Sequence, residues 1–251
     1  MADRIYIKRL DVVDSTNRYA RDESTSIWKE AGGSIIATVT AQHQTAGRGQ
    51  RGNSWSSNSG ENLLLSILVH PLNNLKVTEQ FSLSQAVALA VHDAMQCYGV
   101  TTRLKWPNDI YAGNKKLAGI LVELDYSGTF VEQAIIGIGL NVNQQQFPVM
   151  ERTPVSMRML LDKEFSVEDV LQNLLDKFSS RYSLLCDDKK ESISREYNSL
   201  LLGIGEERCF TDATGEFTAT IEGVESDGHL LLRRNDNRLS RYAFKEVEMK
   251  I

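Results

Sequence analysis

Apolar side chains recur at helical spacing in three long stretches of this chain. Residues 78–98 carry a broad apolar face, and Gly99 directly after them is the residue type that most often ends a helix. Residues 167–186 repeat the pattern behind Ser166, a residue type that commonly caps a helix start. Residues 191–202 complete the set. We therefore predict three helices, each with one face suited to packing on another layer.

The pattern before the first of these helices is that of strands. Residues 5–10 alternate apolar and polar side chains, as an edge strand does, whereas 34–41 and 63–69 are almost continuously apolar, as in a buried strand. After Gly99, short apolar runs follow one another with turn residues between them, which predicts a meander of neighbouring strands. The strands expected there are 100–104, 110–112, 116–126 and 130–140.

The composition changes near residue 204 to short alternating segments separated by turns rich in Asp, Asn and Gly. Four or five small strands fit into this last part, which is too short for a large core of its own and is expected to dock on the rest. The predicted fold class is α+β: a mixed β-sheet with helices packed on it, plus a small C-terminal β-barrel. We expect two domains, residues 1–203 and 204–251.

Composition narrows the classes of protein that fit. The 251 residues are 41% hydrophobic, which suffices for a core, and the net charge of -5 argues against a protein built to grip nucleic acid. The three cysteines lack the spacing of a disulfide framework or a zinc site. No apolar run approaches the ~18 residues of a membrane span, and the start lacks the apolar core of a signal peptide. We expect a cytoplasmic protein with neither a membrane nor a nucleic-acid partner.

The stretch from Gln44 to Trp55 combines three glycines with Arg48 and Arg51. Glycines let the backbone turn sharply and approach a ligand, and arginines supply charged forks that suit a carboxylate or phosphate. The glycine spacing also fits the dinucleotide fingerprint, but that motif needs a helix directly after it, and none is predicted here. A Walker loop is excluded because no Gly-Lys-Ser/Thr closes the segment. The stretch therefore predicts an anion-binding loop.

Two other polar positions have both a structural and a functional interpretation. Ser15, Thr16 and Asn17 precede a short helical stretch, so they could cap that helix or form a polar socket for a small ligand. Lys105 stands just before a turn, where it could be a solvated strand-end lysine or could face the same pocket as the arginine loop.

Five motifs occur in order between residues 14 and 143. They are Asp14-Ser15-Thr16-Asn17, Gln44 to Trp55 with its Gly-Arg-Gly core, Lys105-Trp106-Pro107-Asn108-Asp109-Ile110, Lys-Leu-Ala-Gly-Ile-Leu-Val-Glu at 116–123, and Gly-Ile-Gly-Leu-Asn-Val-Asn at 137–143. With these motifs together, the chain resembles the biotin protein ligases, enzymes that activate biotin as an adenylate and attach it to a carrier lysine. The C-terminal segment is similar to the SH3-like barrel of that family.

The resemblance implies the class II synthetase-like fold of biotin and lipoate ligases. It also implies that biotin and ATP, with Mg2+, form biotinyl-5'-AMP, and that biotin then passes to a lysine of a biotin carboxyl carrier protein or domain. Some members carry an N-terminal helix-turn-helix domain and act as repressors, but here the motifs begin at Asp14. We expect a ligase without DNA-binding function, as a monomer or homodimer.

The resemblance also implies roles for individual residues. Lys105 and Arg48 are expected to be catalytic. Lys105 would neutralise charge where the biotin carboxylate meets the α-phosphate, and Arg48 would fold over the carboxylate and then the adenylate phosphate. The family often has arginine where Gln50 stands, so this loop carries one positive charge fewer. No metal ligands are assigned. The residues expected to bind biotin are Ser15, Thr16, Asn17, Gln44, Arg48, Gly49, Gln50, Lys105 and Gly119. Those expected to bind ATP or the adenylate are Arg48, Arg51, Trp55, Asn108, Lys116 and Asn141.

Two alternatives remain open. A lipoate or octanoate ligase or transferase would share the fold, although the Arg-Arg-x-x-Gly-Gly-Gly type of loop found in those relatives is absent here. A non-catalytic module that senses biotin or an adenylate is the other, and Lys105 together with the arginine loop argues against it.

Overall fold

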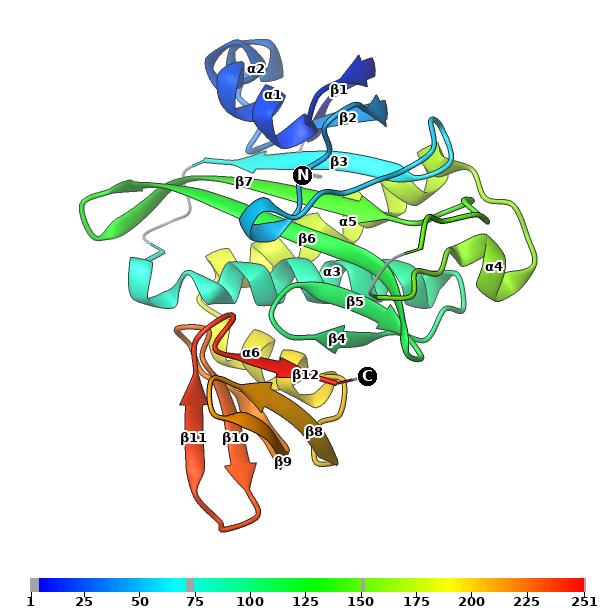
Figure 1. Ribbon diagram of the computed structural model, residues 1–251. Coiled ribbons are helices and arrows are strands. Elements are labelled where there is room, and N and C mark those ends of the chain that lie inside the picture. The colour runs from blue at the N-terminus through cyan, green and yellow to red at the C-terminus, as the bar shows by residue number, and fades with distance from the viewer. Residues whose placement is uncertain (1–4, 71–74, 150–151, 251) are drawn as a thin grey trace.

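The computed structural model describes residues 5–70, 75–149 and 152–250, which form two β-sheets and the helices packed on them (Figure 1). The larger sheet has seven strands in the order β1-β2-β3-β7-β6-β5-β4. β1 and β2 pair in parallel and the other neighbours pair antiparallel, so the sheet is mixed, as predicted. Its strands are β1 (Ile5–Val13), β2 (Ile36–Gln44), β3 (Leu63–Val69), β4 (Arg103–Lys105), β5 (Asp109–Ala112), β6 (Lys115–Ser127) and β7 (Phe130–Leu140).

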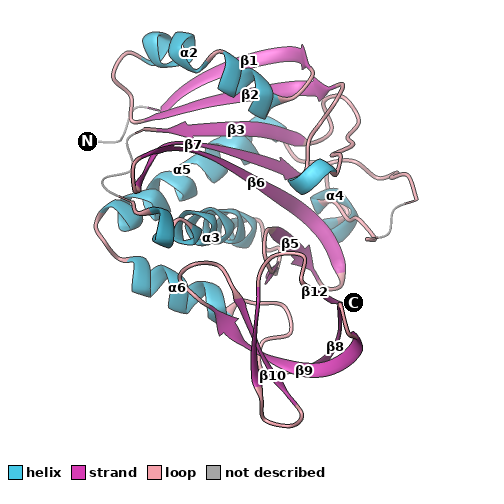
Figure 2. Cartoon of the chain, turned by 60° about the vertical axis from the view of Figure 1, so that its left-hand side comes forward, coloured by secondary structure: helices cyan, strands magenta, loops and turns pink. Residues whose placement is uncertain are grey.

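Helices cover both faces of this sheet (Figures 1 and 2). On one face lie two short helices, α1 (Thr16–Asp22) and α2 (Ser24–Ala31), over a small apolar core of their own. On the other face lie α3 (Phe81–Cys97) and α5 (Val167–Cys186), with α6 (Lys190–Ser199) packed on α3. The connections contain α4 (Met157–Leu161) and two 3-10 turns, η1 (Gln50–Gly52) and η2 (Val77–Glu79).

The helix predicted over residues 78–98 is the centre of the main core. Leu83, Val87, Leu89 and Val91 on α3 are each 0% exposed, so the helix buries nearly its whole circumference between the sheet and α5. Complete burial of one such side chain contributes roughly 1.5–3 kcal/mol before conformational entropy is subtracted. The broad apolar face in the sequence therefore marks the element on which both neighbouring layers rest.

The C-terminal strands form a second, antiparallel sheet in the order β11-β10-β9-β8-β12. Phe210, Ala219 and Leu232 of this sheet belong to the same apolar cluster as α3 and α5, so the small sheet shares the main core. The α+β class is confirmed, whereas the domain boundary between residues 203 and 204 stays a prediction. The strands are β8 (Glu207–Asp212), β9 (Gly215–Val224), β10 (Leu230–Arg234), β11 (Leu239–Tyr242) and β12 (Val247–Met249).

Two local features differ from the sequence predictions. α2 was not predicted, because its eight residues contain only two large apolar side chains, Ile27 and Trp28, which are too few to show a helical repeat in the sequence. Ser15 occupies the N-cap position of α1, but its side chain makes no capping hydrogen bond, so the capping interpretation of Ser15 is wrong. Across the described ranges, no helix is long and apolar enough to cross a membrane.

Candidate active site

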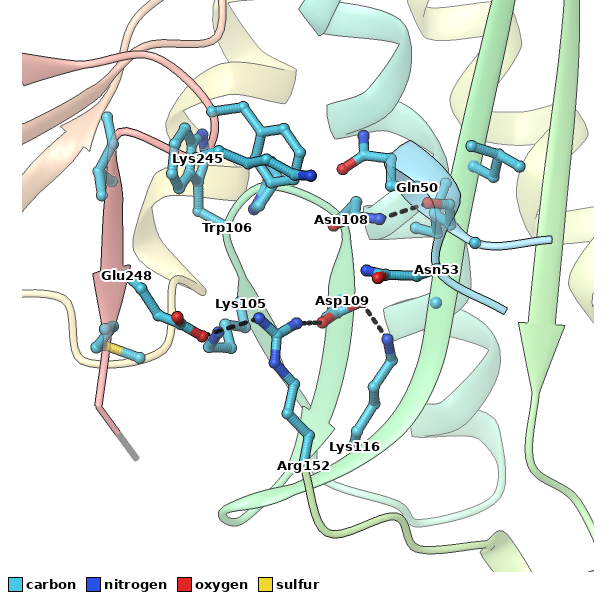
Figure 3. A pocket seen from close by; sticks show the side chains of 18 of the residues that line it. Gln50, Asn53, Lys105, Trp106, Asn108, Asp109, Lys116, Arg152, Lys245 and Glu248 are labelled. Atoms are coloured by element: carbon cyan, nitrogen blue, oxygen red, sulfur yellow. Dashed lines mark hydrogen bonds and ion pairs between the residues drawn. The ribbon is translucent and has the colours of Figure 1, made fainter. Parts of the chain in front are cut away.

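A cavity of about 890 Å3 lies where three parts of the protein meet: the large sheet, the C-terminal sheet and the glycine loop, our name for the stretch from Gln44 to Trp55 (Figure 3). Trp106 joins the two sides, because its indole Nε1 donates to the Gly228 carbonyl at 2.9 Å and its ring meets Phe244 edge-on. Both parts of the chain therefore bound the cavity. The predicted site residues on its wall are Ser15, Thr16, Asn17, Gln44, Arg48, Gly49, Gln50, Trp55, Lys105, Asn108, Lys116 and Gly119.

One end of the cavity is a buried polar network at the start of α1. The Thr16 backbone N–H donates to Gln44 Oε1 at 2.7 Å, and the Asn17 amide Nδ2 donates to Glu123 Oε2 at 2.9 Å. Ser66 Oγ lies 2.8 Å from Thr16 Oγ1 and 2.5 Å from Asn17 Oδ1, so its single proton serves one of them at a time. Each of these groups holds another in place.

Two polar atoms of this network are left over. Within the described part of the chain, the Ser15 hydroxyl and the Gln44 amide Nε2 have no hydrogen-bond partner, although both residues line the cavity and Ser15 is 2% exposed. Because both atoms are open to the cavity, a ligand that enters it can form hydrogen bonds with them. Together they offer a donor and a hydroxyl to a small polar head group.

The glycine loop is a tight hairpin. The Trp55 N–H donates to the Gly47 carbonyl at 2.9 Å, and the Gly49 N–H donates to the Asn53 carbonyl at 2.7 Å. A Cβ at Gly47 would overlap the Trp55 carbonyl, which explains why glycine stands there. Arg48 reaches from this loop to Glu123 on β6, with Nη2 3.2 Å from Oε1. The Arg51 side chain lies outside what the structure describes.

Trp55 lies against two glycines of the large sheet. A Cβ at Gly139 would overlap the indole, and one at Gly119 would come within 3.1 Å of it. Glycine at these two positions therefore leaves room for a side chain of the same protein. Lys116 Nζ lies 5.7 Å from the centroid of the indole, which places a cation beside this aromatic surface.

A cluster of charges lines the opposite wall (Figure 3). The Asp109 carboxylate is 4% exposed and is held on both oxygens, by Lys116 Nζ at 2.7 Å and by Arg152 Nη1 at 3.0 Å. The second arm of Arg152 reaches Glu248 in the C-terminal sheet, at 3.1 Å. This arrangement compensates a buried carboxylate with two cations, as desolvation requires.

Lys105 differs from these cations because it has no ion-pair partner among the described residues, although it is 7% exposed. The pKa of its ammonium is lowered from 10.5 to about 8, mainly by burial and in addition by nearby Arg152, while Asp109 and Glu248 oppose the shift. Its Nζ lies 5.9 Å from the ring centroid of Tyr111, and burial raises the pKa of that phenol to about 12. An unpaired buried cation facing a cavity is suited to an anionic ligand.

The two asparagines predicted to contact the adenylate are engaged with backbone. Asn108 Nδ2 donates to the Ile120 carbonyl at 2.7 Å. Asn141 is 3% exposed and its Nδ2 donates to the Val155 carbonyl at 3.1 Å. Asn141 is not on the cavity wall, so the contact predicted for it would require its other amide atom or a rearrangement. The roles of both residues stay predictions.

Sequence reasoning assigned no role to three residues that the structure brings to the site. Glu123 belongs to a quoted motif and could have been found there. Arg152 and Glu248 lie in no motif, and no local pattern distinguishes them from surface charges. Only the packing of distant segments reveals them.

Comparison with known proteins decides the family. The model of the Biotin/lipoate A/B protein ligase family matches residues 10–141. The chain belongs to this family. A bifunctional ligase/repressor BirA from Bacillus subtilis (strain 168) is 33% identical over 229 residues, which cover 90% of this chain and 69% of that protein. A biotin--[acetyl-CoA-carboxylase] ligase from Paracoccus denitrificans is 31% identical, over 78% of this chain and 84% of that protein.

Solved structures agree with the family assignment. A biotin protein ligase from Aquifex aeolicus in complex with biotin and ATP is 26% identical, has a TM-score of 0.79, and is matched over 98% of both chains. The resemblance to biotin protein ligases predicted from the motifs is confirmed, and with it the prediction of a ligase enzyme. The predicted ligase fold is confirmed as well.

Proposed function

We propose that this ligase activates biotin with ATP to biotinyl-5'-AMP and then transfers biotin to a lysine of a biotin carboxyl carrier protein or domain. The observation that carries the proposal is one cavity with two kinds of wall. At one end a polar network offers an unpaired hydroxyl and amide, and at the other end lie two cations, the buried Lys105 and the half-buried Lys116. A ligand with a neutral polar ring and an acidic tail suits that arrangement.

The binding mode follows from these walls. The ureido ring of biotin would bind the Ser15 hydroxyl and the Gln44 amide, with Thr16 and Asn17 holding that end in shape. Its carboxylate would then point toward Arg48 and the lysines. Gly49, Gln50 and Gly119 would contact the same ligand, and Gln50 contributes a buried side-chain oxygen that has no partner in the described chain. The adenine would lie against Trp55, with Asn108, Lys116, Asn141 and Arg51 around the nucleotide.

The first step is an in-line displacement. A biotin carboxylate oxygen attacks the α-phosphorus of ATP, the bond from that phosphorus to the bridging oxygen breaks, and pyrophosphate leaves. Lys105 and Arg48 would stabilise the negative charge that concentrates between the two anions. In the second step a neutral lysine amine of the carrier attacks the acyl carbon, AMP leaves, and the amine loses a proton.

Among the described residues, none forms a ready-made site for magnesium. The described residues contain no group of three His, Cys, Asp or Glu side chains that could hold a metal ion, and both oxygens of Asp109 are taken by cations. The expectation that Mg2+ accompanies ATP rests on the resemblance, and such an ion would be held mainly by phosphate oxygens and water.

Four finer assignments belong to the proposal. We propose a biotin carboxyl carrier as the protein substrate and a cytoplasmic location, with the enzyme as a monomer or homodimer. The absence of repressor function is also proposed, and the net charge of -5 supports it because binding to a phosphate backbone favours a basic protein.

Pyrophosphate exchange into ATP tests the proposal directly. The assay is run with biotin, lipoate, octanoate or no added acid, and we expect exchange with biotin only. Exchange with lipoate only would identify the protein as a lipoate ligase, a sister enzyme of the same family. Biotin binding without any exchange would contradict the proposed activity and favour a protein that senses biotin. Transfer to a carrier domain, followed by the mass of the biotinylated lysine, tests the second step.

A further inference from the structure

Four charged side chains form a continuous chain across the cavity wall. Lys116 bonds Asp109, Asp109 bonds Arg152, and Arg152 bonds Glu248, with closest distances of 2.7, 3.0 and 3.1 Å (Figure 3). Lys116 lies on β6 and Asp109 on β5 of the large sheet. Arg152 lies between β7 and α4, and Glu248 lies on β12 of the C-terminal sheet. The chain therefore connects the catalytic cavity with the small sheet.

We propose that Arg152 is a positioning residue for the adenylation step, which holds Asp109 so that Asp109 can hold Lys116, and which ties both to the C-terminal sheet through Glu248. The inference rests on the proposed function. Arg152 lies outside residues 10–141, the part that the family model matches, and no sequence motif contains it.

The geometry explains why arginine suits this position. Its planar fork serves two carboxylates at once, Asp109 with one arm and Glu248 with the other, which a lysine ammonium on a flexible stem does less well. Asp109 is nearly fully buried, so removal of one of its two cations leaves a carboxylate that must draw Lys116 closer or admit water. Either response changes the surroundings of the Lys116 ammonium, which now lies beside Gly119 and Trp55.

Arg152 also acts on Lys105 through space. The charged groups that face Lys105 are Arg152 and Lys116, which lower the pKa of its ammonium, and Asp109 and Glu248, which raise it. The phenol of Tyr111 completes these surroundings. Loss of Arg152 should therefore raise the pKa of Lys105, and loss of Glu248 should lower it. A role limited to structural support would not produce shifts of opposite sign.

The experiment compares three variants at this position with one control. Arg152→Met removes the charge, Arg152→Lys keeps the charge without the fork, and Glu248→Gln removes only the link to the C-terminal sheet. Arg233→Met is the control, because Arg233 pairs with Glu222 at 2.7 Å on the exposed side of the small sheet, away from the cavity wall. Thermal melting shows which variants are folded.

The first readout is NMR titration of the full-length protein labelled at lysine Cε, with the Lys105 and Lys116 signals assigned by Lys→Arg variants. We expect the Lys105 midpoint to rise in Arg152→Met, to fall in Glu248→Gln and to stay constant in Arg233→Met. The Lys116 signal should shift in Arg152→Met. Unchanged Lys105 and Lys116 signals in a folded Arg152→Met variant would overturn the inference, and this readout needs no catalysis. If Arg152→Met does not fold, the direction of the Glu248→Gln shift decides in its place.

The second readout is biotin-dependent pyrophosphate exchange. Arg152→Met should lower kcat by about tenfold to a hundredfold, as expected for a displaced catalytic group, with a smaller change in KM for biotin. Arg152→Lys should recover part of the loss. If the wild-type protein shows no exchange, the proposed function fails. The NMR titration still tests whether Arg152 acts on Lys105 and Lys116. If the wild type exchanges and folded Arg152→Met matches it, the positioning role is wrong.

Discussion

At the scale of single residues, hydrogen-bond partners separate the polar side chains in and beside the cavity into two groups. Asn17, Asn108 and Asn141 use their amides to hold other parts of the protein. Ser15 and Lys105 are buried and keep a polar group without a protein partner in the described chain. The second group is therefore where a ligand in the cavity can form new hydrogen bonds and ion pairs. The first group maintains the shape in which that happens.

If Lys105 stabilises the first step as proposed, adenylation should be sensitive to alkaline pH. Its ammonium has a pKa of about 8, so the charge that the first step needs is lost as pH rises through that value. The rate of biotin-dependent pyrophosphate exchange should therefore fall above pH 8. Lys105→Arg, where active, should keep its rate to higher pH because the guanidinium stays charged. An identical alkaline profile in both proteins would remove Lys105 from the mechanism.

The stability effect of the same group has the opposite sign. The pKa of Lys105 is lower in the folded protein than its ordinary value of 10.5. Between about 8 and 10.5 the unfolded chain binds more protons, so this group favours folding increasingly as pH rises. A loss of exchange above pH 8 should thus occur without unfolding, which circular dichroism over the same range can check.

At the scale of elements, the glycine loop and the strands β6 and β7 fit each other. The loop hairpin carries Trp55 onto a surface from which Gly119 and Gly139 remove side chains, and Gly137 does the same for Asn17. A strand normally gains stability from large side chains, so glycines here indicate close approach. The strands thereby create two separate recesses, one beside the polar network and one beside the indole.

Alanine substitutions at Gly139 and Gly137 should weaken the binding of different substrates, because each glycine lies at a different recess. In Gly139→Ala the new Cβ would overlap the Trp55 ring and displace it, so we expect a shifted indole emission and weaker ATP binding. In Gly137→Ala the Cβ would overlap the Asn17 amide, so biotin binding should weaken instead. Tryptophan fluorescence and titration calorimetry with each substrate measure both. If the two variants lose the same substrate, the division of the cavity is wrong.

The loop also has a predicted role in retaining the intermediate. Arg48 links the loop to Glu123 on β6, and a mixed anhydride must be shielded from water until the carrier arrives. Arg48→Ala should therefore release biotinyl-5'-AMP into solution, about tenfold faster or more if one charge-assisted contact is lost. Chromatography of free adenylate during turnover measures this release. No increase over wild type would exclude the clamp.

At the scale of the whole molecule, three helices form the support behind the sheet. Arg181 on α5 reaches Asp93 on α3 at 2.6 Å and Glu196 on α6 at 2.6 Å, and its side chain is 13% exposed. One guanidinium therefore ties together the three helices below the large sheet. The C-terminal sheet packs on this layer through the shared apolar cluster, so the support affects the orientation of the small sheet as well.

Removal of this tie should destabilise the fold without touching the cavity. Arg181→Met leaves two partly buried carboxylates without their cation, and we expect the free energy of unfolding to fall by about 2 to 3 kcal/mol. Arg181 lowers the pKa of Glu196, so this contribution is present at neutral pH and is lost as pH falls through the acidic range. Urea titrations at neutral and acidic pH should show the variant and wild type converging in acid. The exposed pair of Arg233 and Glu222 is the control, with a much smaller effect.

Local sequence pattern was sufficient for much of this protein. The helices around 78–98 and 167–186, the buried strand 63–69 and the C-terminal strands all follow from spacing between near neighbours, because helix and strand periods are short. The five motifs were likewise read from adjacent residues, and they indicated the family and most of the residues on the cavity wall. Charge and composition excluded whole classes of protein but identified no site.

Tertiary structure alone decided how distant segments complete the site. Arg152 is 43 residues from Asp109 and 96 residues from Glu248, so no local pattern can show that one guanidinium bonds both. Local pattern also cannot show that Lys105 is buried without an ion-pair partner in the described chain, because whether a lysine is solvated or buried depends on what packs around it. Residue type and order determine which elements form and which chemistry is available. Burial and long-range pairing determine which of those groups can act.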